Sequence, residues 1–194
     1  MGVVDIDKIR GALLSMGYRP KESYLEAIIM ETNHSLSNAN EAVMFLAQTA
    51  HETGGFRYIE EIAYAGTDEI AYEYGWGAPG KSYHGRGFIQ LSWPGNYEQA
   101  SLSLGYGYKL YENPELVSKN VKLAAKISMW YWKTKVRPVA GDMSKFGLTT
   151  KAINGALECR GQNVDKSKNR YRIYKALARE LGIRNMSSEC GCYN

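Results

Sequence analysis

Two acidic positions close together in the chain are the residues with the clearest potential for chemistry. The run Ala47-Gln48-Thr49-Ala50-His51-Glu52 ends on a carboxylate, and Glu61 follows nine positions later. A sugar acetal is hydrolysed when one carboxylic acid protonates the leaving oxygen and a second carboxylate directs water or attacks the ring. A pair of acids held at the end of a helix therefore indicates cleavage of a glycosidic bond.

Glu52 is predicted to lie in the last turn of its helix. The carbonyl end of a helix carries partial negative charge, so a carboxyl group there is harder to ionise, which suits a general acid. Spacing alone does not choose between Glu60 and Glu61 as the second carboxylate. Neighbouring residues point in different directions on a helix or a strand, so only one of the two can face Glu52.

His51 precedes Glu52, and a His-Glu pair also occurs in zinc proteases. That motif needs a second histidine four positions after the first, where this chain has Gly55. The chain has three histidines in all, so we expect no metal and no other cofactor. We assign His51 a supporting role, as a group that forms hydrogen bonds in the core or braces the following loop.

A second segment, 83–93, joins a glycine turn to polar and aromatic side chains. Gln90 and Ser92 could hold sugar hydroxyls or water, and Trp93, Tyr97 and nearby tyrosines such as Tyr83 could stack on sugar rings. The third glycine of a dinucleotide-binding turn is missing, and no Lys-Ser or Lys-Thr pair follows. The segment therefore favours a sugar over a phosphate ligand.

A third segment, 153–159, presents an amide and a carboxylate at the end of an apolar helix. Asn154 and Glu158 are these residues, and Arg170 on the next predicted helix could pair with Glu158. Such an ion pair would hold a nearby acid in place and change its affinity for a proton, although an ordinary structural salt bridge fits the sequence equally well.

Apolar spacing predicts a mainly helical chain. Asn38 and Glu41 resemble a capping box at the start of the helix that carries Glu52, and Gly54 and Gly55 end it. Between Tyr83 and Trp93, partial alternation predicts a short strand or hairpin. The other helices are expected over 5–16, 24–29, 97–104, 121–132, 149–153 and 168–181.

Length and charge limit the classes of protein. The 194 residues contain no Pro- or Ser-rich linker, so we expect one catalytic domain over 1–194. No apolar run approaches the ~20 residues of a membrane-spanning helix. The net charge of +4 is modest, and the basic residues do not form a nucleic-acid-binding motif. We therefore expect a monomer without nucleic-acid or membrane partners.

The termini and cysteines bear on the compartment. The first eight residues show no secretory signal, so we expect either an intracellular protein or one whose signal was removed. One bridge from Cys159 to Cys190 or Cys192 would close a loop of about 30 residues, worth ~3 kcal/mol. Such a bridge favours an oxidising compartment.

The three segments resemble motifs of the family 19 glycoside hydrolases, the plant- and bacterial-type endochitinases. The resemblance covers about 41–193, with the motifs at 45–55, 83–92 and 153–159 in the family's order. It implies a mainly α (α+β), lysozyme-like fold with two helical lobes around a substrate cleft and a small β element. His84, Phe88 and Ala156 depart from the usual residues, which bears on subsite preference.

The resemblance also implies roles for individual residues. Glu52 matches the general acid, Glu61 the general base and Ser92 the serine that holds water. The substrate-binding residues that it implies are Gln90, Asn96 and Asn154. We add Trp93 and Tyr83 to them, because aromatic rings can stack on sugar rings. Glu158 and Arg170 match the ion network that supports the acid.

The implied activity is that of an inverting endochitinase acting on β-1,4-linked N-acetylglucosamine polymers, secreted after loss of a signal peptide. One alternative is a peptidoglycan hydrolase of the lysozyme or endolysin type, which would be intracellular. A second alternative is an inactive chitin-binding lectin. A lectin need not retain both acids, whereas this chain has them.

Overall fold

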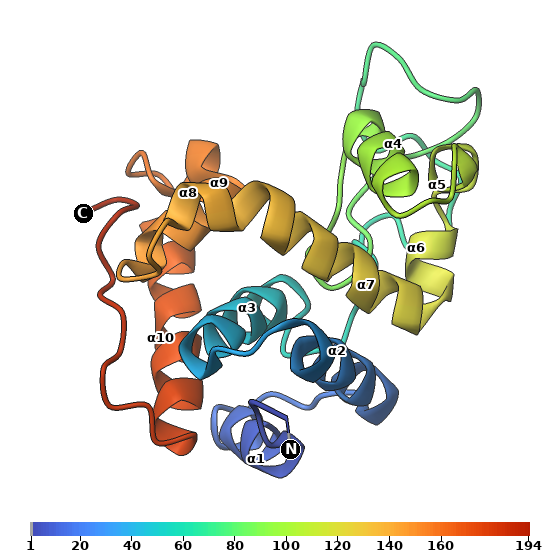
Figure 1. Ribbon diagram of the computed structural model, residues 1–194. Coiled ribbons are helices and arrows are strands. Elements are labelled where there is room, and N and C mark those ends of the chain that lie inside the picture. Colours follow the sequence, from blue (N-terminus) through green and yellow to red (C-terminus); the bar gives the residue numbers. More distant parts are fainter. Residues whose placement is uncertain (1) are drawn as a thin grey trace.

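Helices form two lobes in the computed structural model, which describes residues 2–194 (Figure 1). The smaller lobe contains α4 (Pro94–Ser103), α5 (Lys109–Glu112) and α6 (Leu116–Lys119). The larger lobe contains α1 (Ile6–Ser15), α2 (Glu22–Ser35), α3 (Ala39–Glu52), α8 (Arg137–Ala140), α9 (Phe146–Glu158) and α10 (Val164–Glu180). This arrangement confirms the predicted mainly helical, two-lobed fold.

The helix α3 lies in the centre of the larger lobe. Every residue from Ala42 to Ala50 is buried, and α10 packs along the helix. Asn38 caps its start by accepting a hydrogen bond from the Glu41 backbone N–H at 3.0 Å. A helix that is buried all round has a fixed position, so its last residue, Glu52, is fixed as well.

The helix α7 (Val121–Tyr131) joins the two lobes and continues into a π-helical turn, η1 (Trp132–Val136). Ala124 and Met129 belong to the core of the larger lobe, whereas Ile127 and Trp130 belong to the core of the smaller one. The two hydrophobic cores therefore share a helix. Figure 1 shows α7 crossing the molecule between the lobes.

The segment 53–93 is irregular. The predicted strand or hairpin over 83–93 is reduced to isolated bridges between Glu60 and Arg86 and between Arg86 and Leu91. Gly87 and Gln90 have left-handed backbones, with φ of 78° and 55°, which prevents an extended run. The part of the chain that the structure describes contains no regular strand.

Four helices, α2, α4, α9 and α10, extend beyond their predicted ranges. The helix α4 begins at Pro94, because proline fits the first turn of a helix, where its missing N–H is not needed. The helix α9 continues past its predicted end, but Asn154 is non-helical within it, with φ −147° and ψ 34°. The side chain of Asn154 is thereby placed at a kink.

The bridge predicted from Cys159 is present and joins Cys192, which ties the C-terminal segment to the end of α9. Cys190 is free and exposed. Among residues 2–194, the helices lack the combination of length and apolar character that a membrane-spanning segment requires.

Candidate active site

Glu52 lies in the last position of α3, where a tight turn redirects the chain. The hydroxyl of Thr53 donates to the Thr49 carbonyl at 2.7 Å and accepts from the Phe56 N–H at 2.9 Å, which fixes this turn. A side chain on Gly55 would meet the Tyr18 ring at 2.5 Å. The close approach therefore requires glycine here, as does its φ of 76°.

Arg170 on α10 is the main partner of Glu52. Its Nη2 donates to Glu52 Oε1 at 2.6 Å. The same guanidinium donates twice to Glu158, at 2.8 and 2.9 Å, and its Nη1 donates to Gln48 at 2.8 Å. Arg170 is 1% exposed, so it holds Glu52, Glu158 and Gln48 in one fixed arrangement.

Charges within this buried network favour the ionised forms of Glu158 and Arg170. Burial opposes the charged form of Glu158, but the hydrogen bonds and charge of Arg170, with the Asn154 amide, outweigh it and lower the pKa of Glu158. Burial likewise opposes the charge on Arg170, and the two carboxylates raise its pKa. The network therefore contains one cation and at least one carboxylate anion.

Glu61 is held by a different set of donors. Its Oε2 accepts from the Gly85 N–H at 3.0 Å, and its backbone N–H donates to the Gly85 carbonyl at 2.7 Å. Its Oε1 accepts from the Tyr72 hydroxyl at 2.9 Å. Burial and this hydrogen bond raise the pKa of Tyr72 to about 12, so Tyr72 remains a neutral donor.

Glu60 points away from Glu61 into a separate network. Its carboxylate lies 2.9 Å from His84 Nε2 and 3.5 Å from Arg86 Nε. Burial lowers the pKa of His84 despite the Glu60 contact, which favours a neutral imidazole. Of the two glutamates that spacing left as alternatives, Glu61 lines the same cavity as Glu52, and Glu60 lines a different one.

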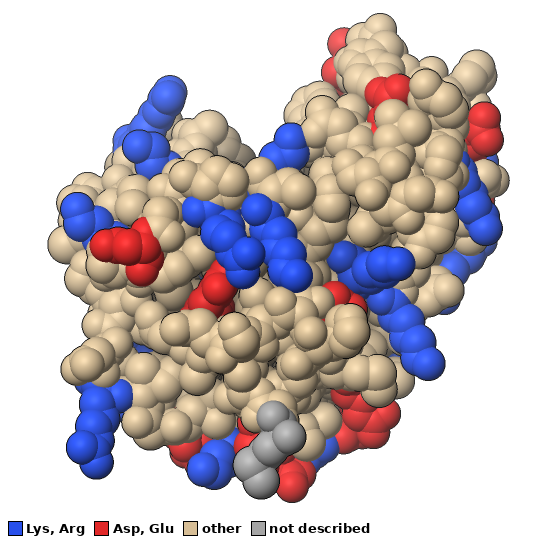
Figure 2. Space-filling model, viewed as in Figure 1, with Lys and Arg blue, Asp and Glu red and all other residues tan. Residues whose placement is uncertain are grey.

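A cavity of about 490 Å³ brings the predicted residues together. Figure 2 shows the molecule hollowed between the two lobes. Of the predicted catalytic and substrate-binding residues, seven line this cavity: Glu52, Glu61, Gln90, Ser92, Trp93, Asn96 and Asn154.

Hydrogen bonds fix the turn that carries four of these residues. The Ser92 hydroxyl donates to the Gln90 carbonyl at 3.1 Å, and the Asn96 amide donates to the Ser92 carbonyl at 2.8 Å. Trp93 has φ of 76°, a strained conformation for a residue with a bulky side chain, and it is half exposed beside the Tyr72 ring. Strain of this kind is common where a side chain must be presented to a ligand.

Four predicted residues are not part of the cavity lining: Glu158 and Arg170 of the network described above, and Tyr83 and His51. Tyr83 is fully buried in the core of the smaller lobe, where its hydroxyl donates to the Tyr111 carbonyl, so the structure does not place it against substrate. His51 contacts Asn169 at 2.9 Å through Nδ1. Burial and the Arg170 charge lower the pKa of His51 to about 3, which fits a neutral bracing group.

The sequence reasoning missed four residues of the site. Gln48 lies one turn before Glu52, and its polarity within an apolar helix was an available signal. Tyr72, Tyr131 and Lys166 line the cavity, but no motif marks them. The cavity thus contains two carboxylates and a lysine, and no group of three or more metal-binding side chains occurs among residues 2–194.

Comparison with known proteins identifies the family. The family model described as chitinase class I matches residues 27–141. An acidic endochitinase of Beta vulgaris is 41% identical over 152 residues, covering 75% of this chain and 51% of that protein. A basic endochitinase of Brassica napus is 39% identical over 183 residues, covering 92% and 66%. The chain spans about half the length of the first of these relatives.

Solved structures share the fold over nearly the whole chain. Chitinase C from Streptomyces griseus superposes with a TM-score of 0.72 at 28% identity, covering 97% of this chain and 96% of that one. A bacterial family 19 chitinase superposes with a TM-score of 0.73 at 30% identity, covering 96% and 98%.

Proposed function

Because this chain belongs to glycoside hydrolase family 19, the family of the class I chitinases, we propose that it is an endochitinase. It cleaves β-1,4 linkages between N-acetylglucosamine residues within a polymer and inverts the anomeric centre. The observation that carries this proposal is that Glu52 and Glu61, held by separate sets of donors, line one cavity.

Glu52 is the proton donor in this mechanism. One of its oxygens accepts from Arg170, which leaves the other for the glycosidic oxygen. A positioned acid of this kind contributes about 10²–10⁴-fold to the rate. The guanidinium also stabilises the carboxylate that forms when the proton has been transferred.

Glu61 is the base that activates water. The donors Gly85 and Tyr72 fix its carboxylate, and Ser92 lines the same cavity with a hydroxyl that can bind the water. Inversion requires the water to attack the face opposite the leaving group, so the two carboxyl groups must stand roughly 6.5–9.5 Å apart. Asn154, Gln90 and Asn96 supply amides for sugar hydroxyls and acetamido groups.

Hydrolysis of chitin hexamer tests this proposal. The parent chain should release dimers, trimers and tetramers from the start, as an endo-acting enzyme does. Glu52→Gln and Glu61→Gln should each lose about 10²–10⁴-fold in kcat with unchanged circular dichroism. If either variant retained parental turnover, the assignment of its carboxylate would be wrong, and binding without any turnover by the parent would indicate a lectin.

Lys166 is the specific observation that favours a second substrate, peptidoglycan. Its side chain lines the cavity, and the peptide stems of peptidoglycan carry carboxylates that a lysine could pair with. Lys166→Gln should then lower turnover of peptidoglycan more than turnover of chitin hexamer. Lys168→Gln, on the same helix but outside the cavity, is the matched control.

A secreted, extracellular location also fits the proposal. The Cys159–Cys192 bridge is stable in oxidising compartments. Mass mapping of this bridge in protein from its native source is the direct test, because an intracellular pool would contain the reduced thiols.

A further inference from the structure

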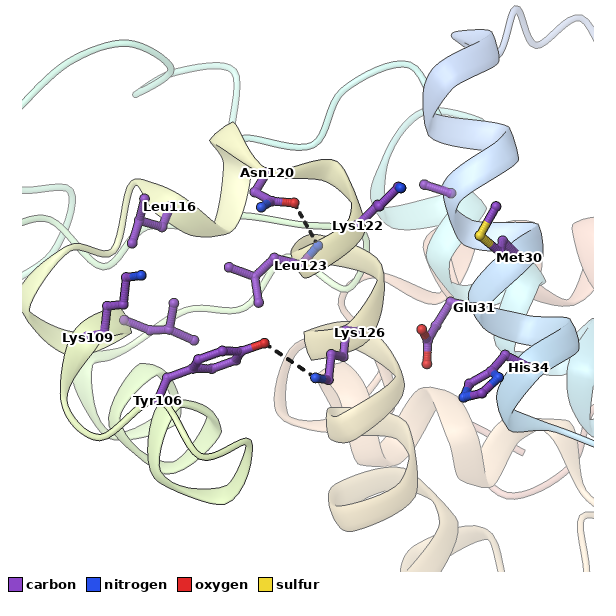
Figure 3. Close-up of a pocket in the computed structure, with 12 residues that line it drawn as sticks. Met30, Glu31, His34, Tyr106, Lys109, Leu116, Asn120, Lys122, Leu123 and Lys126 are labelled. Carbon is purple, nitrogen blue, oxygen red and sulfur yellow. Dashed lines mark hydrogen bonds between the residues drawn. The ribbon is translucent and has the colours of Figure 1, made fainter.

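A second cavity lies between α2 and the segment α5–α7 and shares no residue with the catalytic one. Its volume is about 590 Å³, within the range of about 300–1,000 Å³ typical of sites for small molecules. Figure 3 shows Met30, Glu31 and His34 of α2 on one side of α7, whereas Leu123 and Lys126 of α7 point to the other side, toward Tyr106. Nothing in the proposed hydrolysis uses this cavity.

The walls of this cavity are largely apolar. Met30 and Ala27 come from α2, Leu123 from α7, and Leu110 and Leu116 from α5 and α6. Met30 is 63% exposed, which leaves a large apolar side chain in water at the edge of the cavity. The free energy of binding becomes more favourable by about 25 cal/mol for each Å² of such apolar surface that a ligand removes from water.

The charged side chains around the cavity are mostly cationic. Lys109, Lys122 and Lys126 line it, with Glu31 as the acidic residue of the lining. Within residues 2–194, none of the three lysines forms a salt bridge, and Glu31 accepts a hydrogen bond from Ser35 at 2.6 Å. Basic side chains gather along α7 on the face shown in Figure 2. The cavity is therefore complementary to an anion.

Two other polar residues of the lining, Asn120 and Tyr106, already have partners. The Asn120 side-chain oxygen caps α7 by accepting from the Leu123 N–H at 3.1 Å, and the Tyr106 hydroxyl accepts from Lys126 at 3.3 Å. A peptide would bring many backbone donors and acceptors that need partners here. A ligand whose only polar part is an anionic head leaves no such group unsatisfied.

We propose that this cavity binds a single-chain anionic amphiphile, an alkyl chain that ends in a phosphate or carboxylate. The chain packs against Met30, Leu116 and Leu123, and the head group pairs with Lys122 and Lys126. A neighbouring cavity shares Glu31, His34 and Lys126 with this one and continues past Met129 and Trp130 to Lys133. The combined groove has room for a longer chain.

Calorimetric titration of the full chain with decyl phosphate, below its micelle concentration, tests the proposal. Decyl phosphate should bind with one-to-one stoichiometry. Octyl phosphate should bind about tenfold more weakly, because two methylene groups fewer are buried. Decyl maltoside, which has the same chain and a neutral head, should bind at least tenfold more weakly. The double variant Lys122→Gln/Lys126→Gln should lose about tenfold in affinity for decyl phosphate.

The controls separate this site from general adsorption. Lys8→Gln changes an exposed lysine on α1 and should leave the affinity unchanged. Leu123→Asn should weaken binding through the chain while both lysines remain. Absence of binding, equal affinity for the neutral amphiphile, or unchanged binding by the double variant would each overturn the proposal. Tighter binding of an acidic amphipathic peptide than of decyl phosphate would instead assign the groove to a protein partner.

Discussion

The two carboxylates proposed for catalysis differ in what holds them. Glu52 is bound by the charged guanidinium of Arg170, whereas Glu61 is bound by a backbone N–H and the neutral hydroxyl of Tyr72. A charged partner binds a carboxylate more strongly than a neutral one. The effects of removing the two kinds of partner should therefore differ in size and kind.

Replacing Arg170 should affect stability most. Arg170→Lys retains the charge but cannot reproduce the fork that donates to Glu158, Gln48 and Glu52 together. We expect a loss of about 3 kcal/mol in the free energy of unfolding, measured in urea, because Glu158 keeps a buried charge with fewer partners. Arg172→Lys, on the same helix but exposed and bonded to Asn169, should cost much less. Equal losses would show that the network adds no stability.

Replacing Tyr72 should affect catalysis instead. Tyr72→Phe removes the hydroxyl that donates to Glu61 and keeps the ring beside Trp93. We expect kcat on chitin hexamer to fall about tenfold with little change in KM, because one hydrogen bond to the base is lost. Tyr58→Phe removes an exposed hydroxyl outside the cavity and is the control. A change in KM alone would mean that Tyr72 binds sugar and does not position the base.

Among individual residues, the sequence motifs predicted the charged and amide side chains of the candidate site that lie near glycine turns. Glu52 and Asn154 are polar residues near the ends of apolar helical segments, so the sequence itself draws attention to them. Tyr72 and Lys166 reach the cavity only because distant segments fold together, so no local pattern reveals them. Tyr83 is the opposite case, because this aromatic residue lies within a motif and yet is buried in the hydrophobic core.

Among the elements, helices with one apolar face were predictable and the irregular segment was not. The helices α1, α3 and α7 begin within a residue or two of their predicted starts, because capping side chains of Asp5, Asn38 and Asn120 fix them. The alternation in 83–93 suggested pairing, but positive φ angles at Gly87 and Gln90 break it. Such turns depend on packing against other segments.

The disulfide bridge is an element whose loss can be measured directly. Its closed loop spans 33 positions, for which chain entropy predicts about 3–4 kcal/mol of stability. Cys192→Ser should therefore lower the midpoint of thermal unfolding clearly. Cys190→Ser should not, because that thiol is free and exposed. The opposite order of effects would assign the bridge to Cys190.

The whole molecule depends on contacts between segments far apart in sequence. The helix α10 packs on α3 across more than a hundred positions, and this contact places Arg170 beside Glu52. Periodicity predicted helices, and only the family resemblance predicted that they form two lobes. The relative placement of the lobes, which creates both cavities, follows from the shared helix α7.

Stability of the whole molecule should fall in acid partly through His51. The folded pKa of about 3 lies below the ordinary value of 6.5, because the ring is buried near Arg170. The unfolded chain therefore binds a proton first, and this part of the stability is present above pH 6.5 and lost as pH falls toward 3.

The expected slope is at most about 1.4 kcal/mol for each pH unit in that window. His51→Gln should flatten the dependence of the free energy of unfolding on pH between 6.5 and 3. The exposed His34→Gln is the comparison variant, which removes a histidine on a different helix. An unchanged curve in His51→Gln would mean that the ring is charged in the folded state.

The configuration of the first product is the most direct measurement. Proton NMR of chitin hexamer during the first turnovers distinguishes α from β reducing ends before they interconvert. A water activated by Glu61 and a proton donated by Glu52 predict α products from the β-linked substrate. Initial β products would show retention, and would contradict a mechanism in which Glu61 activates water across the cavity from Glu52.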